Sequence, residues 1–563
     1  MSRIDSIIRL YSEDRISLLA FCAIAACYFY VFTVLEPSIG VLVVLPFFLI
    51  ATFTLILKDP FYGILIFLFV RHLVPESFLR YGSVLHLLYG LMLVAVLVVT
   101  LTRYRKASGG QYYFPDLPSA FKLTLMGFVI VIFISSWQHI FDFRHFFSTE
   151  LLAGWGHVQR WVYVVLFNAF LVAILTVWLT DSMEKFKLLV WSVIVIGLSM
   201  SMEGLIFISG LMPAYVGKVM VYEVTNPEYR LMSLQGISSC ATAHRLLVPL
   251  FFAFYLLVAS KGRHTKWIFI VACVISLALV LTYTRIAYAA AVLGLAYLVI
   301  LTFRQVGART VLPFICIMVA VGFSILEFNF SKEMQGARFV GQFTKKPEAI
   351  NTAVAKGPEV AVAEGPATAT VKGDGDTFRT QDGRIQVAKG PEVQDVGAEK
   401  LPGWMRHFGL TTKWVRWQLI IEAFKDKPVK GWGIGTAKEV LGKYGGLFEE
   451  GPTVGPKLPL EFYSSLHNLY LKWLVETGVL GWIPLLALFF LTAKNLYTVR
   501  RDALAADNTE LGLYSSMLLG TFFCVSPIYF ITSDYDFERF FFLFFALSFV
   551  CKSFSTQCKG TAV

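Results

Sequence analysis

Long apolar runs separated by short polar stretches recur along almost the whole chain. An α-helix needs about 20 apolar residues to cross the hydrocarbon core of a bilayer, and it pairs its backbone polar groups within itself. The pattern therefore predicts an all-α polytopic membrane protein with about fourteen transmembrane helices (12–14). We expect the spans at residues 16–35, 39–57, 61–80, 84–102, 120–140, 158–179, 186–210, 245–260, 267–284, 286–303, 310–328, 466–492, 511–531 and 537–552.

The basic residues between these runs fall on one side of the membrane when the spans alternate strictly. Lys58, Arg103, Lys185 and Arg500 are examples. Because Lys and Arg are enriched in short cytoplasmic loops, we expect this side to be the cytoplasm, with both termini there. The first run is longer than the apolar core of a signal peptide, so it is expected to remain as a span.

A long polar stretch at residues 329–465 separates the eleventh and twelfth spans and falls on the outer face. Such a length exceeds an ordinary connection and is typical of a functional or disordered loop. It divides the chain into the N-terminal helices 1–328, a large periplasmic loop and the C-terminal helices 466–563. Residues 345–400 are poor in aromatic residues and contain Val-Ala-Lys-Gly-Pro-Glu-Val twice, which favours a flexible insertion.

The same loop contains an amphipathic segment near residues 412–426. Trp414, Trp417 and Phe424 share one helical face, and Arg416 projects away from Trp414. This pattern predicts an interfacial helix that lies on the outer membrane surface.

A glycine-rich turn follows that helix. Pro428 ends the helix, and Gly431, Gly433 and Gly435 permit the backbone to approach another group closely. The turn lies outside any strand–turn–helix context, so it does not indicate a nucleotide site.

Composition supports the membrane class, with 56% hydrophobic and 15% charged residues. A net charge of +11 would suit nucleic acid, but the basic residues are spread over short loops, so we exclude that partner. The eight cysteines form no CxxC pair and are expected to be free thiols. The outer face shows no cluster of His, Cys and carboxylates at metal spacing, so neither a metal nor another cofactor is expected.

His467 is the candidate catalytic residue. We expect Ser464 to cap the following apolar helix and to place His467 in its first turn, where the helix dipole disfavours the imidazolium. A neutral imidazole there can act as a general base that takes a proton from an acceptor hydroxyl. The alternative is a histidine that only hydrogen-bonds at the start of an interfacial helix.

Several arginines are expected to face outward. Arg285 lies between two apolar spans, where a charge is costly unless it is paired or faces a polar cavity; the alternative is snorkelling to the interface. Arg230, Arg245 and Arg160 are further outward candidates. Guanidinium groups bind phosphate bidentately without a metal. These arginines therefore suit a substrate that carries a lipid diphosphate, because they can stabilise the charge of the diphosphate as it leaves.

Three motifs together resemble the O-antigen ligase and O-antigen polymerase superfamily of bacterial inner-membrane glycosyltransferases. The first runs from Arg416 through the glycine turn to Gly435. The second is His467-Asn-Leu-Tyr470 followed by Glu-Thr-Gly-Val-Leu-Gly481. The third, Thr284-Arg285, is similar to the family's Ser-Arg-Gly element, with Ile in place of the glycine.

The resemblance implies a GT-C-like, all-helical, metal-independent inverting glycosyltransferase that needs no cofactor. Its donor is a glycan on undecaprenyl diphosphate, and its acceptor is a hydroxyl of lipid A-core or of another molecule. By the resemblance, His467 is the base and Arg285 and Arg230 hold the diphosphate at the periplasmic face of the inner membrane. Arg416 and Tyr470 are expected nearby as phosphate or glycan contacts.

Three alternatives stay open at this point. The sequence does not separate a ligase that completes lipopolysaccharide or another surface polysaccharide from a polymerase of repeat units. Outward arginines also suit a lipid-linked glycan flippase or exporter, although such a transporter would be expected to show paired halves. A non-catalytic scaffold of an envelope assembly complex would leave His467 replaceable.

Overall fold

The computed structural model describes residues 49–73, 82–107, 117–140, 169–208, 239–259, 263–282, 284–306, 411–444, 468–527 and 537–560. Within these ranges the regular elements are all helices, which confirms the expected all-α class. A helix at 49–58 precedes the labelled ones. The labelled helices are α4 (Pro60–Leu73), α5 (Gly82–Ala107), α6 (Ser119–Ile140), α8 (Val172–Leu179), α9 (Met183–Ile208), α11 (Ser239–Ala259), α12 (Arg263–Leu281), α13 (Arg285–Val306), α17 (Thr411–Asp426), α18 (Ala437–Tyr444), α19 (Leu469–Ala505), α20 (Thr509–Val525) and α21 (Phe537–Gly560).

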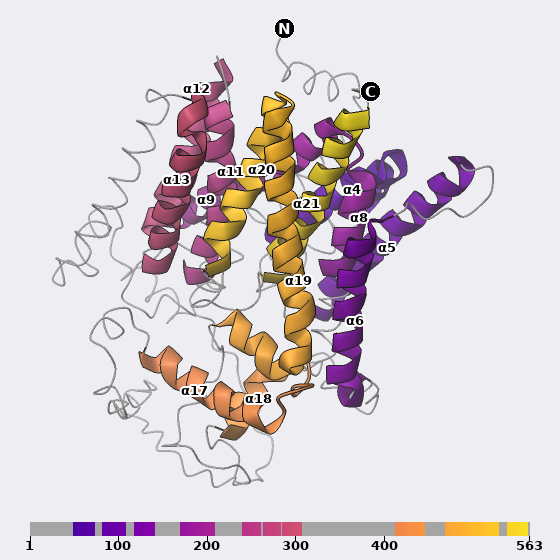
Figure 1. The fold of residues 1–563 in the computed structure, drawn as a ribbon, viewed down its shortest axis with the longest axis vertical. Coiled ribbons are helices and arrows are strands. Elements are labelled where there is room, and N and C mark those ends of the chain that lie inside the picture. Colours follow the sequence, from indigo (N-terminus) through magenta and orange to yellow (C-terminus); the bar gives the residue numbers. More distant parts are fainter. Residues whose placement is uncertain are drawn as a thin grey trace, which may run out of the picture.

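The apolar helices form a bundle, and α17 and α18 lie across one end of it (Figure 1). Helix α19 packs against α20, α21 and α6, and α11 packs against α9 and α12. Aromatic contacts fill the bundle interior. Phe128 of α6, for example, contacts Phe170, Trp473 and Phe542 at ring-centroid distances of 5.8, 5.6 and 5.2 Å.

The bundle has the composition of a membrane protein. Ser119–Trp137, Met183–Ile206 and Leu469–Ala505 are long and apolar enough to cross a bilayer, and shorter apolar helices accompany them in the described part. Large apolar side chains such as Leu123 (69% exposed) face outward, as expected where lipid replaces water. The expected spans 16–35 and 310–328 lie outside the described residues, as does the insertion 345–400.

Helix α19 differs from the expected span 466–492. It begins at Leu469, ends at Ala505 and breaks at Gly478, whose backbone angles (φ 65°, ψ −166°) are not helical. The part after the break, 479–505, is about 40 Å long at 1.5 Å per residue, more than the thickness of the hydrocarbon core. Hydropathy does not mark the break, because it is averaged over a window in which apolar residues outnumber Lys472, Glu476 and Gly478.

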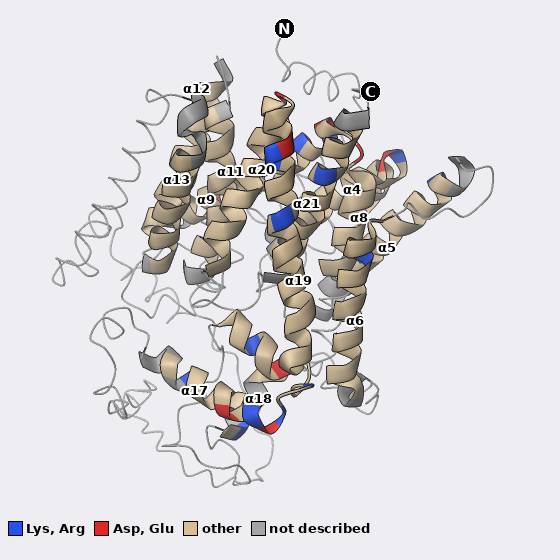
Figure 2. Cartoon of the chain, viewed as in Figure 1, with Lys and Arg blue, Asp and Glu red and all other residues tan. Residues whose placement is uncertain are grey.

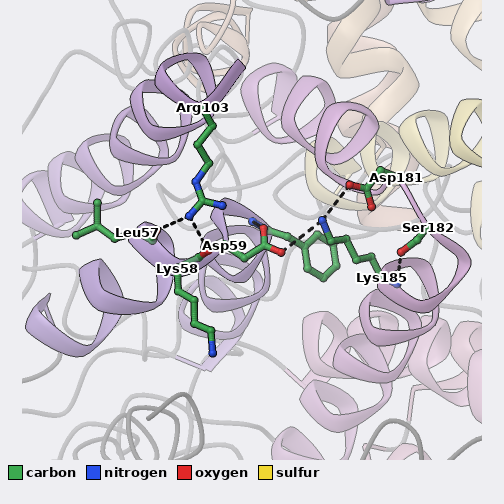
Figure 3. A network of polar contacts seen from close by, with 8 residues as sticks. Leu57, Lys58, Asp59, Arg103, Asp181, Ser182 and Lys185 are labelled. Atoms are coloured by element: carbon green, nitrogen blue, oxygen red, sulfur yellow. Dashed lines mark hydrogen bonds and ion pairs between the residues drawn. The ribbon is translucent and has the colours of Figure 1, made fainter. Parts of the chain in front are cut away.

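Basic residues meet at the bundle end away from α17 and α18 (Figure 2). The Arg103 guanidinium donates to the backbone carbonyls of Leu57 and Lys58, the latter at 2.6 Å (Figure 3). Lys185 lies 3.4 Å from a carboxylate oxygen of Asp59 and 3.1 Å from one of Asp181. Lys58, Arg103 and Lys185 are therefore close together in space. Strict alternation of the spans predicts all three on the same side of the membrane.

The two ends of the bundle give a prediction about sidedness. Lys425 (side chain 61% exposed) lies in the last turn of α17, whereas Asp507 follows the far end of α19. We expect a membrane-impermeant maleimide to label a Lys425→Cys variant in intact cells but an Asp507→Cys variant only after lysis. The unmodified protein gives the background of the natural cysteines. Equal labelling of both variants in intact cells would contradict opposite sidedness.

Candidate functional site

Helices α17 and α18 form a small module with a core of its own at the end of the bundle (Figure 1). The start of α19 contributes to this core through Val475, which is completely buried. The module is thus built partly from the outer loop and partly from the C-terminal helices. Its buried apolar residues are Leu419, Ile420, Ala423, Ala437, Val440, Leu441, Tyr444 and Val475.

Helix α17 has the two faces that the sequence predicted. The rings of Trp414 and Trp417 contact each other at 6.3 Å on the partly exposed face. Arg416 lies on the other face and is only 9% exposed, next in the helix to buried Leu419 and Ile420. Arg416 is therefore part of the module's interior and not of an exposed surface.

The glycine-rich turn after α17 docks onto the break in α19. The amides of Trp432 and Gly433 donate to the carbonyls of Val475 and Glu476 at 2.9 and 2.8 Å. In return, the amide of Val479 donates to Pro428 at 2.8 Å, and the amide of Leu480 donates to Val429 at 3.3 Å. The carbonyls and amides that the interrupted helix cannot pair internally are thus satisfied by the turn.

Two glycines make this docking sterically feasible. Gly431 (φ 69°) and Gly478 (φ 65°) both adopt left-handed backbone conformations. A Cβ at Gly431 would lie 2.4 Å from the Glu476 carbonyl, and one at Gly478 would lie 2.2 Å from the Val429 oxygen. The close backbone approach predicted from the glycines is confirmed, and its partner is the backbone of α19.

Further contacts hold the turn in place. Ser136, at the end of α6, accepts a hydrogen bond from the amide of Ile434 at 2.9 Å. The Glu476 carboxylate accepts one from the amide of Ala437 at 3.3 Å, where its charge is favourable at the N-terminus of α18. The N-terminal helices thus contribute to the site as well. Sequence reasoning missed Ser136; a buried serine pair in an apolar run was the only signal for it.

The start of α19 corrects one expectation. Asn468 (2% exposed) caps the helix, its side chain accepting a hydrogen bond from the amide of Leu471 at 3.0 Å. The proposed cap, Ser464, would start the helix too early, because Asn468 offers a side-chain acceptor directly before Leu469. In the sequence, His467 therefore directly precedes the capping residue.

The remaining candidates are only partly described. His467, Arg230 and Arg160 lie outside the described residues, and Arg285 is described by its backbone alone, as the first residue of α13. Arg245 is 3% exposed within α11. Both α11 and α13 begin at the end of the bundle that carries the module (Figure 1).

Tyr470 joins two helices. It is 8% exposed, and its hydroxyl donates to the backbone carbonyl of Ser526, at the end of α20, at 2.8 Å. Its ring lies 6.3 Å from that of Trp482, beyond the break in α19. Tyr470 therefore helps to fix the short helical segment that follows His467.

In the part of the chain that the structure describes, these features define a bundle of apolar helices in which the α17–α18 module is bonded to a broken helix. Residues 268–486 match the O-antigen ligase family model, Wzy_C. This range contains both partners of the docked turn. Over these residues the match confirms the resemblance to the O-antigen ligase and polymerase superfamily. A search of curated proteins found no match to the chain.

Replacement of Gly478 by alanine tests the docking. A left-handed conformation costs a non-glycine residue about 1–3 kcal/mol, and the clash with Val429 adds to that. We expect Gly478→Ala to lower the thermal unfolding midpoint and to expose the 428–435 turn to proteolysis. Gly512→Ala is the matched control, since its Cβ would meet Leu504 at an ordinary 3.5 Å. Equal stability of the two variants would contradict the docking.

Ser136 gives a second test. Its replacement by alanine leaves the buried amide of Ile434 without this acceptor, at a cost of about 1–3 kcal/mol. We expect Ser136→Ala to increase hydrogen exchange in the 428–435 turn. Thr124→Ala is the control, because the Thr124 hydroxyl bonds within the same helix, to the carbonyl of Ala120 at 2.8 Å. Unchanged exchange in Ser136→Ala would show that this bond does not hold the turn.

Proposed function

We propose that the protein transfers a glycan from undecaprenyl diphosphate to an acceptor hydroxyl at the periplasmic face of a bacterial inner membrane, as an O-antigen ligase does. The observation that carries this proposal is the family match over residues 268–486, within which two motifs distant in sequence are bonded together. Members of this family are glycosyltransferase-like enzymes that act on lipid-linked glycans.

The docked turn supports a catalytic role for the start of α19. His467 directly precedes Asn468, which is buried and caps the helix. The segment 469–477 is then held by the glycine turn at one end and by the Tyr470–Ser526 hydrogen bond at the other. A general base needs such a fixed backbone, because proton transfer depends on a short, oriented contact.

The proposed reaction is a single displacement. The acceptor hydroxyl oxygen attacks the anomeric carbon as His467 takes the hydroxyl proton, and the bond from that carbon to the diphosphate oxygen breaks. The anomeric centre inverts, and the diphosphate leaves on its lipid. Arg285 and Arg230 would stabilise its charge without a metal, with Arg245 or Arg160 as alternatives to Arg230.

Arg416 and Tyr470 have supporting roles in this proposal. Arg416, buried within the module, would bind a phosphate or a sugar through its guanidinium. The Tyr470 hydroxyl already donates to Ser526, so Tyr470 would act mainly by holding the helix start beside the glycan.

The proposal includes a membrane arrangement. About fourteen spans form a GT-C-like fold, with residues 1–328 and 466–563 as the membrane parts and 329–465 as a periplasmic loop. Both termini are cytoplasmic by the positive-inside rule. The end-to-end separation of the basic cluster from α17 and α18 supports this orientation (Figure 2).

Reconstitution with a lipid-diphosphate glycan donor tests the chemistry. We expect product with the wild type on either a lipid A-core acceptor, which indicates a ligase, or a second lipid-linked repeat unit, which indicates a polymerase. His467→Ala and Arg285→Ala should each lower the rate at least about 100-fold, as is typical for loss of a general base or of a charge-stabilising group.

Lys425→Ala serves as the matched control, because Lys425 is exposed and pairs with Glu422 of its own helix at 2.7 Å. It should retain the wild-type rate. Undiminished product from both His467→Ala and Arg285→Ala would refute the catalytic assignment. Movement of the donor across the bilayer without any product would favour the exporter.

A further inference from the structure

Three lysines gather around Trp432 in the glycine turn. The Lys427 ammonium lies 3.9 Å from the centroid of the Trp432 ring, and that of Lys443 lies 5.2 Å from it. Lys430, two residues before Trp432, is exposed, as is Lys443. The cluster therefore combines a residue just before the turn, one within the turn and one from α18.

The ring at the centre of this cluster is fixed in position. The indole N–H of Trp432 donates to the carbonyl of Ala423 at 2.8 Å, and its backbone amide donates to Val475 at 2.9 Å. Tyr444 contacts the ring edge-on at 6.0 Å. Cation–π contacts with a fixed ring hold the ammonium groups close together despite their repulsion.

Among the described residues, the positive charge of the lysine cluster is not neutralised by carboxylates. Within these residues, no carboxylate pairs with Lys427, Lys430 or Lys443. The nearby Asp426 accepts a hydrogen bond from the Tyr444 hydroxyl, and Glu422 pairs with Lys425. Burial lowers the pKa of Lys427, and the charges of Lys430 and Lys443 lower it further. An external anion would relieve this repulsion.

The surroundings of the cluster indicate the kind of anion. The turn is bonded to α19 at Val479 and Leu480, where the long apolar part of that helix begins. Val429 (61% exposed) and Val479 (52% exposed) lie at this junction, and Ile483 (64% exposed) follows one turn later. The lysines thus lie next to the start of an exposed apolar stripe on α19. A phospholipid has the same order, with a charged phosphate followed by apolar acyl chains.

We propose that Lys427, Lys430 and Lys443 bind the phosphate of an anionic membrane phospholipid whose acyl chains lie along the exposed face of α19. These lysines are different residues from the arginines proposed for the donor diphosphate. The bound lipid would anchor the α17–α18 module to the membrane surface.

Lipid binding to the full-length protein in neutral detergent tests this site. Native mass spectrometry would compare phosphatidylglycerol with phosphatidylcholine of the same acyl chains, without donor or acceptor. We expect the wild type to prefer phosphatidylglycerol. The Lys430→Gln/Lys443→Gln variant should bind it about 25-fold more weakly, since a lysine near a membrane surface contributes about five-fold.

Lys425→Gln removes a charge close by and should change the affinity less than about two-fold, since Lys425 is already paired with Glu422. The unfolding midpoints of both variants should equal that of the wild type, because the replaced side chains are exposed. Equal binding of the two lipids by the wild type, or equal weakening by Lys425→Gln, would overturn the proposal. Competition by inorganic phosphate as strong as that by phosphatidylglycerol would indicate a free-anion site and would also overturn it.

Discussion

Four backbone hydrogen bonds between the glycine turn and the break in α19 connect the outer module to the membrane bundle. A helix interrupted at Gly478 leaves carbonyls and amides unpaired, and inside a membrane protein such groups are costly unless another segment satisfies them. The turn 428–435 supplies these partners. The positions of α17 and of the start of α19 both depend on this pairing.

The break also divides α19 into two parts with different packing partners. Residues 479–505 continue as one helix that is apolar enough to cross a bilayer, whereas 469–477 pack with the module across its end. A straight α19 would instead extend its N-terminal turns away from α17, and Val475 would not reach the core of the module. The glycine is therefore what lets a membrane helix contribute residues to a site outside the hydrocarbon.

Hydropathy was sufficient to predict the all-α class, and the motifs were sufficient for the family, because both depend on residues close in sequence. The glycines at 431 and 435 indicated a close approach, but only the fold shows that α19 is the partner. Ser136 could not be predicted, because its role depends on a contact with Ile434 almost 300 positions away. By residue type Ser464 and Asn468 are equally good caps, and the sequence alone does not decide between them; in the structure Asn468, which is nearer the apolar run, is the cap.

Positive charge has different surroundings at the two ends of the bundle. At one end Lys185 and Lys187 are paired with carboxylates, and Arg103 is bonded to backbone carbonyls, so these charges are largely compensated within the protein. At the other end, the described residues leave the lysines around Trp432 without a carboxylate partner. A count of basic residues per loop treats both ends alike. The contacts distinguish charges that stabilise helix ends from charges that remain available to a phosphate.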